Sequence, residues 1–302
     1  MKIGAMDVMW YNLPFKERVD RIAKLGFKGF QPWLLTAELG FKIPTSWFPK
    51  GGDFKHIALT PRELNRIVQE ARLEITCFGP HYVLGETPSF WGDPGIPEFK
   101  SEEEKRERLE DIKKLITYSR DANVNIVTLF SGGDPRRREY WSQLVDLTRL
   151  IVDFAEKSGI TLAMENMPQL LVDDENSLLK LVKEVDSKNL KINFDPKNLN
   201  ALGRNVPDAV RKLRGEICHT HAGDSIPGGG EFGKGPGGKW IMPVIGKGTV
   251  PYLEYVRALK EIGYDGWMVI ESSGDERGFE PDMMESKQYL ESVLSKISRS
   301  RL

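Results

Sequence analysis

The sequence predicts an α/β fold, a barrel of eight parallel strands, because short apolar runs alternate with amphipathic helical stretches from end to end. Such (β/α)8 TIM barrels use about 200 to over 400 residues, and this chain has 302. No linker interrupts the alternation, so we interpret residues 1–302 as a single barrel domain with its active site at the C-terminal ends of the strands. The expected strands lie near residues 2–7, 27–33, 73–79, 125–130, 160–165, 190–195, 216–221 and 267–271.

Local signals mark the helices between these strands. Thr60-Pro-Arg-Glu63 and Ser101-Glu-Glu-Glu104 have the spacing of capping boxes, in which side chains satisfy the free amides of the first helical turn. Gly26, Gly159 and Gly263 are expected to end helices in the left-handed conformation.

The alternative fold is an open, doubly wound sheet. That fold would need a glycine-rich phosphate loop after the first strand. The segment that follows here, Asp7-Val-Met-Trp-Tyr-Asn12, contains no glycine, so the closed barrel is favoured.

Composition favours a globular protein without attraction for polyanions. The chain has 43 basic and 44 acidic residues and a net charge of −1, so we expect no nucleic-acid partner and no membrane binding. Its longest uncharged stretch, residues 122–133, is too short to span a bilayer. Cys77 and Cys218 fall in predicted strands and are expected to be free thiols in a reducing cytoplasm. The predicted location is therefore cytoplasmic, and a homo-oligomer is compatible with these numbers.

Polar side chains close four consecutive apolar runs in the second half of the chain. A single acid at a strand end is more often a solvated loop start, but four corresponding positions are harder to dismiss. Three carboxylates and one imidazole make a hard oxygen and nitrogen cage, suited to one divalent ion such as Mn²⁺, Mg²⁺, Co²⁺ or Zn²⁺. The four predicted metal ligands are Glu165, Asp195, His221 and Glu271.

With these residues in place, the chain resembles the xylose-isomerase-like TIM-barrel superfamily of sugar isomerases, sugar epimerases and endonuclease IV. The resemblance covers nearly the whole chain. It is carried by Ala163-Met-Glu-Asn166, Asn193-Phe-Asp-Pro-Lys-Asn198, His219-Thr-His-Ala-Gly-Asp224, Gly246-Lys-Gly-Thr-Val250 and Gly263-Tyr-Asp-Gly-Trp-Met-Val-Ile-Glu271.

The resemblance implies that the four matching residues bind one catalytic metal ion, with manganese among the candidates. It implies an isomerase or epimerase of carbohydrate metabolism that acts on a small sugar or polyol. Proton transfer next to a carbonyl, through a metal-bound enediolate, would use Glu165 and Glu271 as the catalytic groups. Return of the proton to the other face gives epimerisation, and return to the neighbouring carbon gives isomerisation. Loss of a β-hydroxyl instead gives a keto-sugar or inosose dehydratase, a lyase and the main alternative.

Three positions depart from the pattern of ketose 3-epimerases in this superfamily. Asn198 stands where a histidine usually follows the metal aspartate, and Pro227 stands where an arginine usually follows the metal histidine. Gln31 ends the second predicted strand, where a glutamate is common. These differences weaken an assignment to ketose 3-epimerase and leave the cage intact.

Other members of the superfamily fit less well. Endonuclease IV holds three zinc ions with many histidines, whereas this chain has four histidines in total. Xylose isomerase proper needs further acids after the seventh strand, where only Asp224 is available, so proton transfer is favoured over hydride shift. A non-catalytic sugar-binding protein would be expected to lack one of the ligands, and none is missing.

Four further residues are predicted to contact the substrate: Trp10, Trp33, His81 and Asn198. Aromatic rings near strand ends can pack against the C–H face of a sugar, which makes the two tryptophans candidate walls of the site. His219 is expected to point to the opposite side of its strand from His221 and to serve as a packing or supporting residue. Residues 228–238, with seven glycines, are expected to form a mobile lid.

Overall fold

The computed structural model describes residues 1–7, 10, 13–32, 59–79, 102–133, 136, 138–168, 170–227, 243–272 and 278–299. Within them, eight parallel strands form one sheet in the order β3-β2-β1-β8-β7-β6-β5-β4, as the sequence predicts. The strands are β1 (Lys2–Met6), β2 (Gly29–Gln31), β3 (Glu74–Ile75), β4 (Ile126–Leu129), β5 (Thr161–Glu165), β6 (Leu190–Phe194), β7 (Ile217–Ala222) and β8 (Trp267–Ile270).

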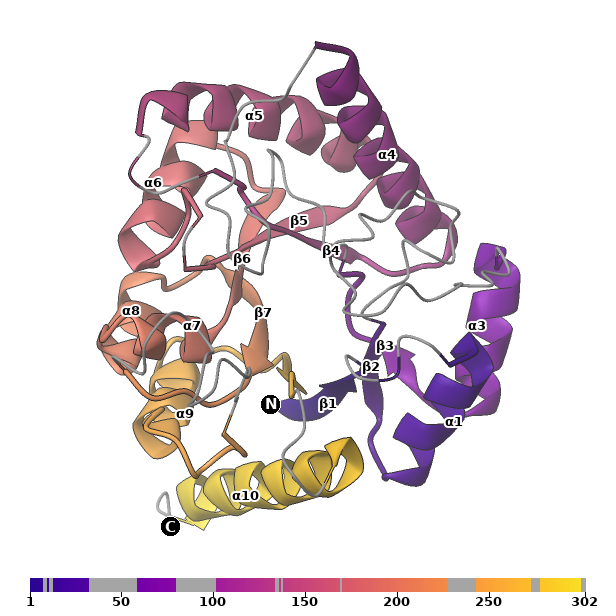
Figure 1. The fold of residues 1–302 in the computed structure, drawn as a ribbon, viewed down its shortest axis with the longest axis vertical. Helices are drawn as coiled ribbons and strands as arrows, with labels where there is room; N and C mark the ends of the chain where they lie inside the picture. Colours follow the sequence, from indigo (N-terminus) through magenta and orange to yellow (C-terminus); the bar gives the residue numbers. More distant parts are fainter. Residues whose placement is uncertain are drawn as a thin grey trace.

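The two end strands of this order also meet. Phe78, just past β3, pairs in parallel with Val127 of β4. Its N–H donates to the carbonyl of Ile126 at 2.9 Å, and its carbonyl accepts from the N–H of Thr128 at 2.8 Å. The sheet therefore curls into a barrel with the helices outside it, and the doubly wound alternative is excluded (Figure 1).

Helices follow the strands in the alternation that the sequence predicts. A 3₁₀ turn, η3 (Arg138–Tyr140), directly precedes the helix that follows β4. The α-helices are α1 (Phe15–Lys24), α3 (Pro61–Glu70), α4 (Glu102–Asp121), α5 (Trp141–Lys157), α6 (Glu175–Val185), α7 (Pro196–Ala201), α8 (Val206–Lys212), α9 (Tyr252–Glu261) and α10 (Phe279–Arg299).

The helix-boundary signals are confirmed where the structure describes them. The Thr60 side chain accepts a hydrogen bond from the N–H of Glu63, whose carboxylate accepts from the N–H of Thr60 in return. Gly26, Gly159 and Gly263 have φ values of 75°, 70° and 82°, the left-handed region that favours glycine. The second predicted capping box begins at Ser101, outside the described residues.

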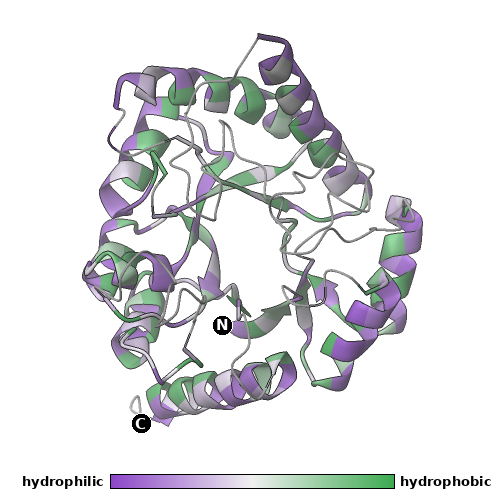
Figure 2. Cartoon of the chain, in the orientation of Figure 1, coloured by the Kyte–Doolittle hydropathy of each residue, from purple (hydrophilic) through white to green (hydrophobic). Residues whose placement is uncertain are grey.

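One large cluster of buried apolar side chains fills the space between sheet and helices. Phe30 and Phe194 contribute from strands, and Val19, Leu64 and Ile151 contribute from helices. The helices turn hydrophobic residues toward the barrel and hydrophilic residues outward (Figure 2). Burial of this apolar area is the main stabilising contribution to the fold.

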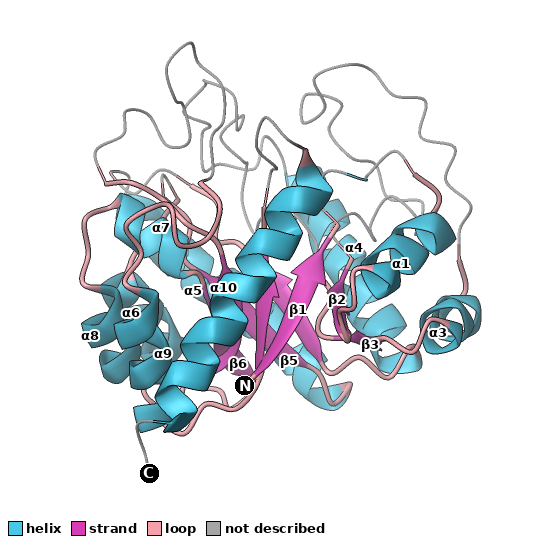
Figure 3. Ribbon diagram, turned by 90° about the horizontal axis from the view of Figure 1, so that it is seen from below, coloured by secondary structure: helices cyan, strands magenta, loops and turns pink. Residues whose placement is uncertain are grey.

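Both cysteines are free, as predicted. Burial raises the pKa of the Cys218 thiol to about 12 and raises that of Cys77 well above its ordinary value. In the described part of the chain, no helix combines the length and apolar character needed to cross a membrane. The parallel strands all point toward one end of the barrel (Figure 3), and this end carries the predicted ligands.

Candidate metal centre

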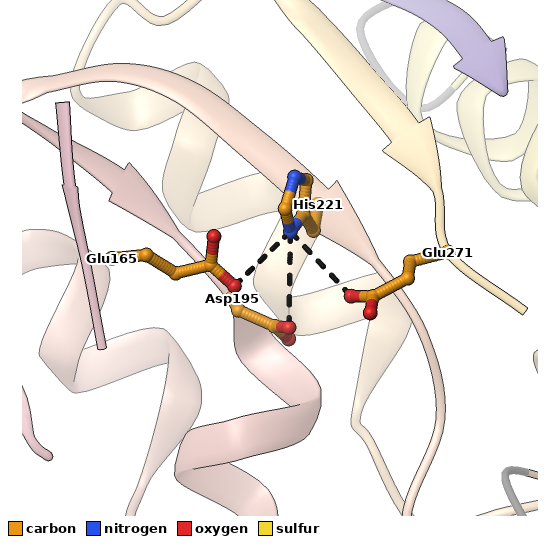
Figure 4. A group of neighbouring side chains, drawn as sticks. All are labelled: Glu165, Asp195, His221 and Glu271. Carbon is orange, nitrogen blue, oxygen red and sulfur yellow. Dashed lines mark ion pairs between the residues drawn. The ribbon is translucent and has the colours of Figure 1, made fainter. Parts of the chain in front are cut away.

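The four predicted ligands meet at the C-terminal ends of neighbouring strands. Each offers one ligand atom, and these atoms all lie within 4.8 Å of one another. Glu165 ends β5, Asp195 directly follows β6, His221 lies near the end of β7, and Glu271 directly follows β8. Their side chains converge in Figure 4, with the carboxylates turned toward the imidazole. We call this group the cage.

The centre of the cage lies in front of His221 Nδ1. This atom is 3.2 Å from Glu165 Oε1, 3.5 Å from Glu271 Oε2 and 4.0 Å from Asp195 Oδ2. It is buried and has no hydrogen-bond partner among the described residues. A divalent ion with ligand distances of about 2.0–2.3 Å would give this nitrogen a partner and would balance the carboxylates. The donor set therefore fits a metal ion.

Gln31 and Asn193 contact the cage residues at atoms that do not face the centre of the cage. Gln31 Oε1 lies 3.1 Å from His221 Nε2 and can only accept, and the Asn193 amide nitrogen lies farther from Nε2, at 3.3 Å. The nearer contact favours the proton on Nε2, which leaves the lone pair of Nδ1 facing the cage. The Asn193 amide donates to Glu165 Oε2 at 2.7 Å. The glutamine that replaces a common glutamate thus has a supporting contact here.

The loop after β6 fixes Asp195. Its Oδ1 accepts hydrogen bonds from the N–H groups of Lys197 at 2.8 Å and Asn198 at 3.3 Å, which makes it the N-cap of α7. Asn166 bonds to both the N–H and the carbonyl of Asp195, each at 2.9 Å. The other carboxylate oxygen of Asp195, Oδ2, faces the cage.

Lys197 is a member of the site that sequence reasoning missed. Its Nζ donates to Asp195 Oδ2 at 2.5 Å and to Glu271 Oε2 at 2.6 Å, and its side chain is only 5% exposed. Burial lowers the pKa of Lys197, but the charges of Asp195 and Glu271 outweigh it and hold the pKa above its ordinary value. One signal was available, because the first turn of a helix is an unfavourable place for a cation unless an anion compensates it.

The electrostatics of the cage follow from burial and from the packing of like charges. Burial lowers the pKa of His221, but Glu165 and the other carboxylates raise it further, to about 8. Burial raises the pKa of Glu165, and His221 only partly offsets this. Without a cation at its centre, the cage therefore favours a bound proton.

The prediction for the side of β7 on which His219 lies is wrong. Residues two apart on a strand share a face, and the rings of His219 and His221 meet edge-on with centroids 5.8 Å apart. His219 Nδ1 lies 2.9 Å from Asn193 Oδ1, and Nε2 lies 3.3 Å from Thr76 Oγ1. Burial lowers the pKa of His219 well below its ordinary value. It therefore lies one layer below the cage, where it contacts the residues that support the ligands.

The acid after β7 has a structural role. Asp224 Oδ1 accepts from the N–H groups of Ser225 at 2.9 Å and Val250 at 3.0 Å. Its Oδ2 accepts from Gly246 at 2.8 Å and Gly248 at 3.0 Å. Both carboxylate oxygens of Asp224 thus accept hydrogen bonds from backbone amides, so Asp224 anchors the turn at residues 246–250.

Two of the predicted substrate contacts can be placed. Trp10 is buried and packs edge-on against Phe279, with ring centroids 4.9 Å apart. Asn198 is fully buried, and its amide donates to the carbonyl of Asn166 at 2.8 Å. Its Oδ1 is buried and has no hydrogen-bond partner among the described residues. Their roles toward substrate stay predictions; Trp33, His81 and the predicted lid at residues 228–238 lie outside the described residues.

The model of a protein family, the xylose isomerase-like TIM barrel, matches residues 19–293. The chain belongs to this family. That membership confirms the resemblance given by the strand-end motifs.

Three curated relatives show the range of reactions near this chain. An uncharacterized protein of Methanocaldococcus jannaschii is 32% identical over 216 residues, covering 67% of this chain and 69% of the relative. D-psicose 3-epimerase of Ruminiclostridium cellulolyticum is 22% identical over 285 residues, covering 90% and 83%. The 3-dehydroshikimate dehydratase of Bacillus anthracis is 25% identical over 209 residues, covering 69% and 66%. The named relatives thus include an epimerase and a dehydratase on one scaffold.

Proposed function

We propose that this protein is a divalent-metal-dependent sugar isomerase or epimerase that moves a proton next to a carbonyl. The observation that carries the proposal is the cage, in which the buried His221 Nδ1 faces three carboxylates and has no hydrogen-bond partner in the part of the chain that the structure describes. Glu165, Asp195, His221 and Glu271 would hold one ion, with Mn²⁺, Mg²⁺, Co²⁺ and Zn²⁺ as candidates. The proposal takes residues 1–302 as one barrel domain and a small sugar or polyol as the substrate.

The ion, when bound, supplies Lewis acidity that polarises a substrate carbonyl and acidifies the neighbouring C–H. Glu165 and Glu271 are placed to move the proton. They come from β5 and β8, which β6 and β7 separate in the sheet, and their carboxylates approach His221 from opposite sides in Figure 4. One glutamate would take the proton from one face of the substrate and the other would return a proton to the opposite face, which inverts the carbon.

The two glutamates differ in their surroundings. Glu165 is buried, and its raised pKa favours the proton-bound form. The Glu271 side chain is 17% exposed and accepts a hydrogen bond from the Lys197 ammonium. Solvent exchange at one face without net epimerisation, in Glu165→Gln or in Glu271→Gln, would assign the two roles.

The second candidate function is a dehydratase acting on a keto-sugar or an inosose. The same proton removal would be followed by loss of a β-hydroxyl, so the cage would serve both reactions. The relationship to a 3-dehydroshikimate dehydratase favours this candidate.

The test is turnover of a panel of keto-sugars and inososes in D₂O with Mn²⁺-loaded protein. Proton transfer places solvent deuterium at the reacting carbon, and dehydration releases an unsaturated product. Glu165→Gln and Glu271→Gln keep the shape but remove the base, and each should slow turnover at least ~10²-fold. Glu216→Gln, which removes a carboxylate paired with Lys191 outside the cage, should leave the rate unchanged. Retention of the substrate hydrogen, or wild-type turnover in both cage variants, would contradict proton transfer by these glutamates.

A further inference from the structure

A lysine ammonium is built into the cage, and neither the metal chemistry nor the proton transfer proposed above requires it. Lys197 Nζ bonds to Asp195 Oδ2 and Glu271 Oε2. In each of these two side chains, the oxygen that accepts from Lys197 is also the oxygen that lies closer to His221 Nδ1. The lysine therefore shares its acceptors with the ion that the cage would hold.

The rest of the side chain is fitted into the barrel. A Cβ added to Gly223, in the loop after β7, would lie 2.7 Å from Lys197 Cδ, so the absence of a side chain there leaves room for the lysine stem. Ser225 Oγ donates to the Lys197 carbonyl at 2.8 Å and fixes its backbone. Burial of a long cationic side chain costs much rotamer entropy. The contacts around Lys197 must therefore hold the side chain in this position.

The charges give the lysine a function. The cage holds three carboxylates, of which Glu165 and Asp195 are buried and Glu271 is nearly so. Buried like charges repel unless cations compensate them. A divalent ion and the Lys197 ammonium together carry three positive charges, which equals the negative charge of the three carboxylates. In the metal-free protein, the ammonium bonds to both Asp195 and Glu271 and holds these two carboxylates together.

The Lys197 ammonium also disfavours binding of the ion. An ion coordinated at about 2.3 Å by an oxygen that also accepts from Nζ at 2.6 Å must lie within about 5 Å of the ammonium. At that separation the dication and the ammonium repel each other more strongly than in bulk water, because the cage is largely buried. Binding of the ion therefore has a cost that a cage of the same ligands without lysine would lack.

We propose that Lys197 is a built-in counter-cation of the cage, which preorganises Asp195 and Glu271 without metal and weakens the hold of the cage on the ion. The consequence is a site that takes up and releases its ion readily. The inference deepens the proposed function, and it rests on the cage being a metal site.

The test is calorimetric titration of chelator-treated protein with Mn²⁺. Lys197→Met keeps the length of the side chain and removes the charge, and it should bind Mn²⁺ at least ~10-fold more tightly than the wild type. Its metal-free form should melt at a lower temperature than the metal-free wild type, because Asp195 and Glu271 lose their cation. Its melting temperature should then rise more on addition of Mn²⁺.

Two further variants control for packing. Lys197→Arg keeps the charge and should keep the weak wild-type affinity. Lys191→Met makes the same substitution on β6, at a lysine that pairs with Glu216 at 2.8 Å outside the cage, and should leave the affinity for Mn²⁺ unchanged. Should Lys197→Met fail to fold, Lys197→Gln provides a second neutral variant with the same expected gain.

The outcomes separate the two proposals. Wild-type or weaker affinity for Mn²⁺ in a folded neutral variant overturns the counter-cation inference and leaves the metal site standing. Tighter binding by Lys197→Arg also overturns it. Absence of Mn²⁺ binding by the wild type and by the neutral variants refutes the metal site, and the inference with it.

Discussion

Two polar layers lie one above the other in this barrel, and β7 contributes a histidine to each. His221 lies in the cage, and His219 lies in the layer below, on the same face of the strand. Both are buried, yet the pKa of His221 is raised to about 8 and that of His219 is lowered. Carboxylates of three other strand ends surround His221, whereas the neutral side chains of Asn193 and Thr76 contact His219. The neighbouring strands therefore decide which histidine faces the carboxylates of the cage and which lies in the layer below them.

The largest expected effect comes from removing each histidine in turn. His221→Ala removes a direct ligand and should weaken Mn²⁺ binding more than ~100-fold, beyond the range typical of residues that only orient ligands. His219→Ala should act mainly on stability, by about 1–3 kcal/mol, because it leaves the side-chain oxygen of Asn193, Oδ1, without a donor. Calorimetric titration and urea unfolding of the two variants measure the contrast. Equal loss of metal affinity in both variants would mean that His219 contributes to metal binding as much as His221 does.

An intermediate effect is expected for the residue that joins the layers. Asn193 donates to Glu165 and contacts His219, so Asn193→Ala should weaken Mn²⁺ binding by ~10–100-fold, the range for groups that orient metal ligands. Asn189→Ala is the matched control, because Asn189 donates to the carbonyl of Ile160 at the other end of β5. Both affinities come from the same titration. An Asn193→Ala affinity equal to that of the control would show that the lower layer does not orient the cage.

The smallest expected effect is a pH dependence that distinguishes the two histidines in chelator-treated protein. The pKa of His221 rises from 6.5 to about 8 on folding, so its protonation stabilises the folded state. This contribution, about 2 kcal/mol, is fully present below pH 6.5 and is lost as the pH rises through about 8. Folding lowers the pKa of His219 from 6.5, so its contribution to stability is present above pH 6.5 and is lost only as the pH falls below that value.

Urea unfolding across the range from pH 6.5 to above pH 8 measures this dependence. His221→Gln should remove the fall in stability with rising pH, and His219→Gln should keep it. The opposite result would assign the bound proton to the lower layer.

The sequence was sufficient for the fold and for bringing the four cage residues together, because both depend on local patterns. Short apolar runs predict the strands, and the polar residue that ends each run falls at the same end of a parallel barrel. Asp195 and His221 could therefore be identified without knowledge of what they contact. All eight predicted strands are present.

The remaining parts of the site depend on contacts between distant segments. Lys197 meets Glu271 across 74 residues of sequence, and Gln31 meets His221 across 190, and no periodic pattern encodes such pairs. The error about His219 had a simpler cause, because a two-residue step along a strand returns to the same face. Correct use of that period would also have placed Asn193 on the face of Asp195, directly below the cage.

The central claim is that the four strand-end residues hold one divalent ion. Elemental analysis of protein dialysed against Mn²⁺ tests it most directly, with His221→Ala as the control. The account predicts one ion per wild-type chain, removed by a chelator, and a clear loss of the ion in the variant. Three zinc ions per chain, or an ion content that is the same in the wild type and in His221→Ala, would contradict it.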